Sequence, residues 1–250
     1  MSVKVVLSLI LLILMILIGG KRGIKSFFTL YINLIIVFIV IIFISYNFNP
    51  MFVTIIGCCV IGCISLFFIN GINKKTISAF ISVIIVVLLM IILVYIVGQN
   101  SKIQGFSDEE FDSISPYSLY IHTDFIKTTI CVILMGLIGA IVDVAISIAS
   151  SINELYLHNS RLSFKELYKS GINIGKDILG TTTNTLYFAF IGSFMALIIW
   201  LNELNYSLSQ TINSKVFASE IIQILCCGIG TVLIIPITSY VSSKILSMKK

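Results

Sequence analysis

The chain has 250 residues, of which 58% are apolar and only 11% are charged, and its net charge is +5. Soluble globular domains are about 45–50% apolar and about 25% charged, so this composition excludes an ordinary soluble protein. The mean hydropathy of +1.10 is that of a membrane protein. Membrane orientation explains the basic excess better than nucleic-acid binding does, so no nucleic-acid partner is expected.

Seven segments are apolar enough to cross a bilayer as helices, because one crossing takes about 20 mainly apolar residues. Their ranges are 3–20, 28–46, 51–70, 77–98, 127–150, 184–202 and 217–241. The first has no small-residue cleavage site and is followed at once by basic residues, so we expect an uncleaved helix. No linker or second domain interrupts the pattern. The sequence therefore predicts one transmembrane domain over 1–250, an all-α, polytopic helix bundle in contact with the lipid bilayer.

Lysine and arginine residues in the connections predict the orientation, since cytoplasmic loops carry most of them. With the N-terminus outside, the outer connections hold four basic residues, namely Lys4, Lys102, Lys127 and Lys215. The inner connections hold twelve: Lys21, Arg22, Lys25, Lys74, Lys75, Arg161, Lys165, Lys169, Lys176, Lys244, Lys249 and Lys250. Seven spans then place the N-terminus outside and the C-terminus inside.

The fifth segment carries a carboxylate within its apolar run. Small and polar residues share one face of this helix at intervals of three or four residues. They are Gly136, Gly139, Asp143, Ser147, Ser150 and Ser151. Small residues allow neighbouring helices to approach closely, so we expect this face to point into the bundle. Inserting an aspartate at the centre of a membrane helix costs about 2.5–3.5 kcal/mol, so we expect Asp143 to have a role. Three roles stay open: a protonated carboxyl that bonds between helices, a cation site or relay, and a catalytic group.

A second polar stretch, SGINIGKDILGTTTNTLYFAFIGS, runs from Ser170 to Ser193. Its glycines and polar residues stand just before and within the sixth predicted span. They are Gly171, Gly175, Asp177, Gly180, Thr181, Asn184, Thr185 and Gly192. Threonine and asparagine are good N-caps, which favours a surface helix, a turn at Gly180 and a new capped helix. The alternative is a helix N-terminus with its amides and hydroxyls facing a cavity. Asp177 could pair with Lys169 or Lys176, or share a site with Asp143.

These two stretches resemble the YibE/F-like family of bacterial multi-pass membrane proteins. The matching residues are Gly139, Ala140, Asp143, Ser147, Ser150, Glu154, Gly171, Gly175, Asp177, Gly180, Thr181, Asn184, Thr185 and Gly192. The match covers about 139–193, and the other spans fit by hydropathy and order. The resemblance implies a bacterial plasma-membrane protein of the short, membrane-only kind. It also implies a longer companion subunit, with a homo-oligomer as the alternative.

The polar residues indicate a general class of function but no particular substrate. We expect a permease or transporter component whose substrate or ion path runs past Asp143, Ser147, Ser150, Ser151, Asp177, Thr181, Asn184 and Thr185. The alternative is a membrane scaffold subunit that does not transport. No nucleotide fingerprint or zinc spacing is present, so we expect no enzyme, no cofactor and no metal. A lesser candidate is a divalent-cation site from His122, Asp124 and the acidic residues between 108 and 112.

Overall fold

A computed structural model describes residues 2–101, 103, 124–203 and 205–247 of the chain, and all secondary structure in this part is helical. The helices are α1 (Val3–Ser45), α2 (Pro50–Cys63), η1 (Ile64–Phe68, a π-helical continuation of α2), α3 (Lys74–Asn100), α5 (Phe125–His158), α6 (Phe164–Glu203), α7 (Leu208–Asn213) and α8 (Lys215–Ser247). The prediction of an all-α protein is confirmed for these residues.

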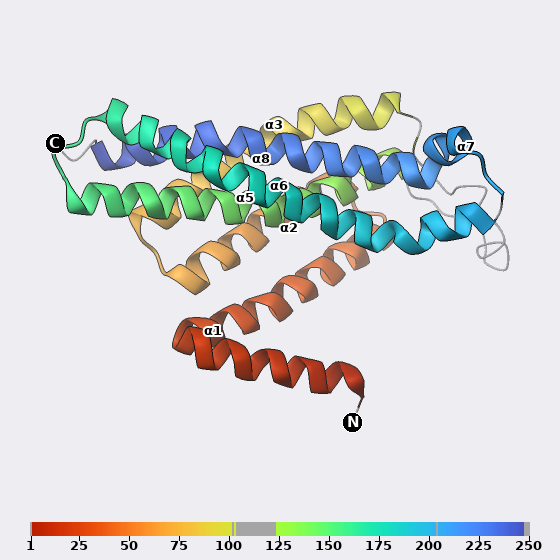
Figure 1. Cartoon of the computed structure of the whole chain (residues 1–250), viewed down its shortest axis with the longest axis horizontal. Helices are drawn as coiled ribbons and strands as arrows, with labels where there is room; N and C mark the ends of the chain where they lie inside the picture. The colour runs from red at the N-terminus through yellow and green to blue at the C-terminus, as the bar shows by residue number, and fades with distance from the viewer. Residues whose placement is uncertain (1, 102, 104–123, 204, 248–250) are drawn as a thin grey trace.

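The long helices form a bundle in which α5 packs against α2, α3, α6 and α8. Figure 1 shows α3, α5, α6 and α8 running along the long axis of the molecule, with α1 folded out to one side. Large apolar side chains fill the interior of the bundle. Those that are almost fully buried include Met90, Ile130, Leu137, Ile141 and Ile234. The apolar residues of α3, α5 and α8 therefore provide most of the packing that holds the bundle together.

A break at Gly20 divides α1 into two arms. Gly20 has φ 53° and ψ −132°, values outside the helical range that glycine adopts readily. A straight helix of 43 residues would be about 65 Å long, roughly twice the hydrocarbon thickness of a bilayer. Figure 1 shows the resulting V shape, and the Tyr31 hydroxyl donates to Ser8 Oγ across it at 2.8 Å. Most apolar side chains of both arms are exposed, as lipid-facing helices require.

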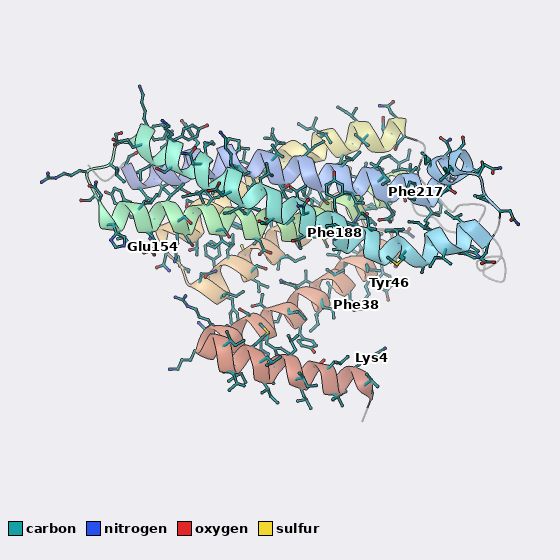
Figure 2. All side chains as sticks on the ribbon, in the orientation of Figure 1. Lys4, Phe38, Tyr46, Glu154, Phe188 and Phe217 are labelled. Atoms are coloured by element: carbon teal, nitrogen blue, oxygen red, sulfur yellow. The ribbon has the colours of Figure 1, made fainter. Side chains whose placement is uncertain are left out.

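The number of crossings differs from the prediction. Five described helices are long and apolar enough to cross a membrane, and a sixth is counted if the bent α6 is one span. The predicted segments 3–20 and 28–46 both lie in α1, so the count of seven is not confirmed. Figure 2 shows Glu154 at one end of the long axis, with Lys4 and Phe217 toward the other.

The helix α6 corrects the prediction for the second polar stretch. Instead of a turn at Gly180 and a new helix start, one helix continues from Phe164 to Glu203. The Thr181 hydroxyl donates to the Ile178 carbonyl and the Thr185 hydroxyl to the Thr181 carbonyl, both at 2.9 Å. These threonines are thus satisfied inside the helix and cap nothing. A glycine inside a helix costs about 1 kcal/mol, so Gly180 weakens α6 locally without ending it.

The start and the bend of α6 lie elsewhere. Ser163 and Glu166 form a capping box, in which the Ser163 N–H donates to Glu166 Oε2 at 2.7 Å and the Glu166 N–H donates to Ser163 Oγ at 3.4 Å. Toward the other end, Phe164–Gly192 and Phe194–Leu201 are inclined by 47°. The helix therefore starts about twenty residues before the predicted sixth span.

Candidate functional site

The polar face of α5 lies on the outside of the bundle, contrary to the expectation that it points inward. Gly139, Asp143 and Ser147 are exposed, while their neighbours Val142 and Val144 are buried. No described atom lies within 4 Å of a Cβ built on Gly139. The reason is that α5 packs on several sides through its large apolar residues, and this narrow strip is what remains. Gly139 is thus not used for packing inside the described chain.

The hydroxyls on this strip bond within their own helix. Ser147 Oγ donates to the Asp143 carbonyl at 2.8 Å, and Ser151 Oγ donates to the Ser147 carbonyl at 2.9 Å. Ser150 and Ser151 are half-buried. Among the described residues, no side chain forms a hydrogen bond or an ion pair with the carboxyl of Asp143. Asp143 is therefore a polar group at the surface of an apolar helix, without a partner in the described part of the chain.

Helix register relates the depths of the two polar stretches. A Cβ on Gly171 of α6 would lie 2.7 Å from Ile152 Cδ1 of α5, and the two helices run antiparallel. From this contact, away from the α5–α6 connection, nine residues along α5 lead to Asp143 and nine along α6 lead to Gly180, about 13.5 Å in each case. Asp143 is thus level with Gly180 and Thr181. The two stretches are separate in the sequence, but they carry polar residues at the same depth of the bundle.

The polar residues of α6 lie on two flanks of this helix. Asp177, Gly180, Thr181, Asn184 and Thr185 are all exposed. Gly180 and Asn184 line a groove between α6 and α8, together with Lys176 and Tyr187. Helical periodicity puts Thr181 and Thr185 on the other flank, away from the groove. The structure therefore separates Asn184 from the two threonines that the sequence grouped with it.

Asp177 forms no ion pair with Lys169 or Lys176 among the described residues. Its register places it level with Ile146, about one helical turn from the depth of Asp143, and its side chain is exposed. The ion pair found in the described chain is that of Lys127 Nζ with Asp124 Oδ2, at 3.0 Å. There the hydrogen bond from the Lys127 side chain holds the pKa of Asp124 below its usual value.

The six glycines of the prediction fall into two groups. A Cβ on Gly171 would lie 2.7 Å from Ser239 Oγ, and one on Gly175 would overlap the Ile235 side chain, so both glycines are needed for the contact between α6 and α8. A Cβ on Gly136 would lie 2.7 Å from Nε2 of Gln223 on α8, so this glycine also belongs to the packed group. The other three, Gly139, Gly180 and Gly192, have no described atom within 4 Å of such a Cβ.

A set of buried hydroxyls near the C-terminal end of α8 was not predicted. The hydroxyl of Ser242 donates to Ser78 Oγ of α3 at 3.0 Å, and Ser82 Oγ donates to the Ser78 carbonyl at 2.8 Å. The set comprises Ser78, Ser82, Thr238, Ser239, Ser242 and Ser243, all at most 2% exposed. On α8 they form two neighbouring pairs four residues apart, Thr238–Ser239 and Ser242–Ser243. This spacing, at the end of the seventh predicted span, could have indicated a polar helix face.

Among the described residues, no three His, Cys, Asp or Glu side chains come together in a cluster that could hold a metal ion. The candidate cation site with His122 and the acidic residues between 108 and 112 lies outside the described residues, apart from Asp124. Asp124 instead caps α5, where its carboxylate accepts from the Lys127 N–H at 3.2 Å.

Comparison with known families gives a match that covers nearly the whole chain. A sequence model of the YibE/F-like protein family matches residues 7–248. No curated protein and no solved structure matches the chain. The resemblance that the residues between 139 and 193 suggested is thereby confirmed, and it extends from the first turns of α1 to the end of α8.

Proposed function

Because this chain belongs to the YibE/F-like protein family, and its helices are those of a membrane protein, we propose that it is a subunit of a permease-type assembly. A second polypeptide covers the outer face of α5, and a polar path runs between the two subunits. Asp143, Ser147, Thr181 and Thr185 line this path from the side of the described chain. The partner is a longer YibE/F-like companion or another copy of this chain, in the plasma membrane of a bacterium, and the role is not enzymatic.

The exposed carboxyl of Asp143 carries the proposal. Ionisable residues inside membrane helices are costly, and they face a bundle interior or a water-filled cavity in almost all cases. Asp143 does neither within the described chain, although it lies among the apolar residues of α5. A lipid-exposed carboxyl would keep this cost in full. A partner subunit, with water at the boundary, removes the cost and gives the carboxyl a role in selecting or moving a cation.

The level of the hydroxyls supports a path rather than a single contact. Thr181 of α6 is level with Asp143, and Ser147 follows one helical turn closer to the end where α5 and α6 connect. Small residues next to the carboxyl, above all Gly139, leave room for a partner helix or for water. Such a row of oxygens suits a cation or a small polar solute.

The proposal includes seven crossings with the N-terminus outside. The two arms of α1 count as separate spans, because the break at Gly20 reverses the chain, and the bent α6 counts as one. The basic residues support this orientation. The break in α1 and the connections that lead into α3 and α6 lie toward one end of the molecule (Figure 1), and the sequence puts Lys21, Lys74 and Arg161 at these places. Lys4 lies toward the other end (Figure 2).

Thiol labelling at position 147 tests the path. In a background without the six native cysteines, Ser147→Cys is treated with a membrane-impermeant thiol reagent from each side of native membranes. We expect labelling from at least one side, because water reaches the path. Ile35→Cys, at a lipid-facing position of α1 that is 55% exposed, is the matched control and should not react. Protection of the thiol at position 147 from both sides, in a folded protein, contradicts the path.

A scaffold without transport is the second candidate, and the hydrogen bonds on α5 favour it. The hydroxyls of Ser147 and Ser151 are satisfied by carbonyls of their own helix, so neither needs water. The same face would then be a dry contact between subunits. The labelling experiment separates the two candidates, because a dry contact protects the introduced thiol while cross-linking still finds a partner.

A further inference from the structure

A groove of about 720 Å³ runs between α6 and α8 on the outside of the bundle. Lys176, Thr183, Asn184 and Tyr187 line its α6 wall, and apolar residues line its α8 wall. The groove does not include Asp143, and it lies on the flank of α6 opposite to Thr181 and Thr185. It is therefore a feature separate from the proposed path.

The groove has one charged end. Lys176 is the charged side chain that lines it among the described residues, and Lys176 lies at the end nearest to the start of α6. Asp177 follows directly in the sequence but is not part of the lining. Successive residues of a helix point about 100° apart, so this carboxylate faces away from the groove. The charged end thus offers a cation to an anionic group.

The rest of the groove is shaped for a hydrocarbon chain. On its α8 wall Leu225, Ile229 and Val232 are 41–50% exposed, so apolar surface is open along the whole length. The distance along α6 from Lys176 to Tyr187 is eleven residues, or about 16 Å. This matches one leaflet of a bilayer, whose hydrocarbon core is about 30 Å thick in total.

We infer that this groove binds an anionic phospholipid, with its phosphate at Lys176 and an acyl chain along Leu225, Ile229 and Val232. Basic pockets between membrane helices on the cytoplasmic side bind anionic head groups, and juxtamembrane lysines attract anionic lipid. In the proposed orientation Lys176 lies on that side. Thr183 and Asn184 offer a hydroxyl and an amide to the ester groups of the lipid. The inference does not depend on a path at Asp143.

Fluorescence quenching by brominated lipids tests this site. The chain has one tryptophan, Trp200, so the double variant Trp200→Phe, Tyr187→Trp places a single reporter in the groove. The full chain is reconstituted in phosphatidylcholine vesicles that contain rising fractions of brominated phosphatidylglycerol or brominated phosphatidylcholine. We expect half-maximal quenching at an about fivefold lower fraction of the anionic lipid, the preference that one lysine near the surface supplies.

Two further variants sharpen the test. Lys176→Gln should abolish the preference for the anionic lipid, while Lys75→Gln on α3, outside the groove, should leave it unchanged. Gly228→Phe should reduce quenching by both lipids, because Gly228 lines the groove and no described atom lies within 4 Å of its Cβ position. This open space also lets the variant fold, which circular dichroism checks.

Three results would overturn the inference. They are equal quenching by the two brominated lipids, a preference for the anionic lipid that survives Lys176→Gln, and protection of the reporter from both lipids. The last result would mean that a polypeptide fills the groove. Failure here leaves the labelling of position 147 unaffected, because that position lies on α5 outside the groove, so the two proposals fail separately.

Discussion

Gly175 and Gly180 lie five residues apart on α6, and their surroundings are opposite. A side chain on Gly175 would overlap Ile235 of α8, whereas no described atom lies within 4 Å of a Cβ on Gly180. The same contrast separates Gly171, packed against Ser239, from Gly139 on α5. The packed glycines let α6 and α8 approach closely, and the open ones lie on surface that no described residue covers. In the proposed assembly, small residues at membrane depth have two uses, one in packing within the chain and one in contact with the partner.

The largest effect is expected from filling a packed glycine. Gly175→Leu places four additional carbons against Ile235, and overpacking of this kind costs about 3 kcal/mol or more. We expect loss of a monodisperse, thermally stable protein in detergent. Gly180→Leu, on the same helix, is the matched control and should melt within a few degrees of the unchanged protein. Equal loss of stability in both variants would remove the distinction between the two groups of glycines.

The next largest effect concerns assembly rather than folding. Gly139→Leu should leave the melting temperature of the isolated chain nearly unchanged, because the space at Gly139 is open. In native membranes the same variant should lose most of its cross-linked partner, since a leucine keeps the partner helix away from α5. Quantitative cross-linking and a thermal melt on one preparation measure both. A variant that assembles normally would show that the partner does not approach Gly139.

Asp143 distinguishes a partner that uses the carboxyl from one that only covers it. In detergent, Asp143→Leu should change the free energy of unfolding by less than about 1 kcal/mol, because the carboxyl has no described partner to lose. In membranes, Asp143→Leu should weaken assembly more than Asp143→Asn, since asparagine still forms hydrogen bonds. Blue native electrophoresis of the two variants gives the comparison. Identical assembly of both would assign the carboxyl no part in the contact.

A smaller effect on stability is expected from removing the buried hydroxyl contact between α3 and α8, on the inner face of the bundle. Ser242→Ala removes the donor to Ser78 Oγ and should cost about 1 kcal/mol. Ser78→Ala should cost a similar amount, and the double variant less than the sum, because both changes remove one bond. Denaturation of the four proteins closes the cycle. Strict additivity would show that the two hydroxyls do not interact.

The smallest effect lies at the start of α5, outside the membrane-spanning part. The pKa of Asp124 is lowered, first by the hydrogen bond from the Lys127 side chain, so the stabilisation is present above the usual pKa of about 4. It is lost as the pH falls through the lowered pKa of the folded state. Hydrogen exchange at the first turn of α5 should therefore lose protection at more acid pH. Asp124→Asn, which keeps a cap, should make this protection independent of pH, and unchanged dependence would contradict the assignment.

Composition and hydropathy were enough to predict a helical membrane protein, and the residues from 139 to 193 were enough to predict its family. The orientation predicted from Lys and Arg stays a prediction. Periodicity also grouped Gly139, Asp143 and Ser147 on one face of α5 correctly. It could not tell whether this face points in or out, because a small, polar strip suits a contact within the chain and a contact with another chain equally well. The continuous α6 was missed because threonine caps a helix in one context and bonds to a preceding carbonyl in another.

Photo-cross-linking at position 147 tests the central claim most directly. A photoreactive residue replaces Ser147 on the outer face of α5, and a control protein carries it at Ile35 on the lipid-facing surface of α1. After irradiation of native membranes, the account predicts a covalent product of two polypeptides from position 147 and lipid adducts alone from position 35. Lipid adducts alone at both positions would contradict it, since Asp143 would then face the bilayer without a partner.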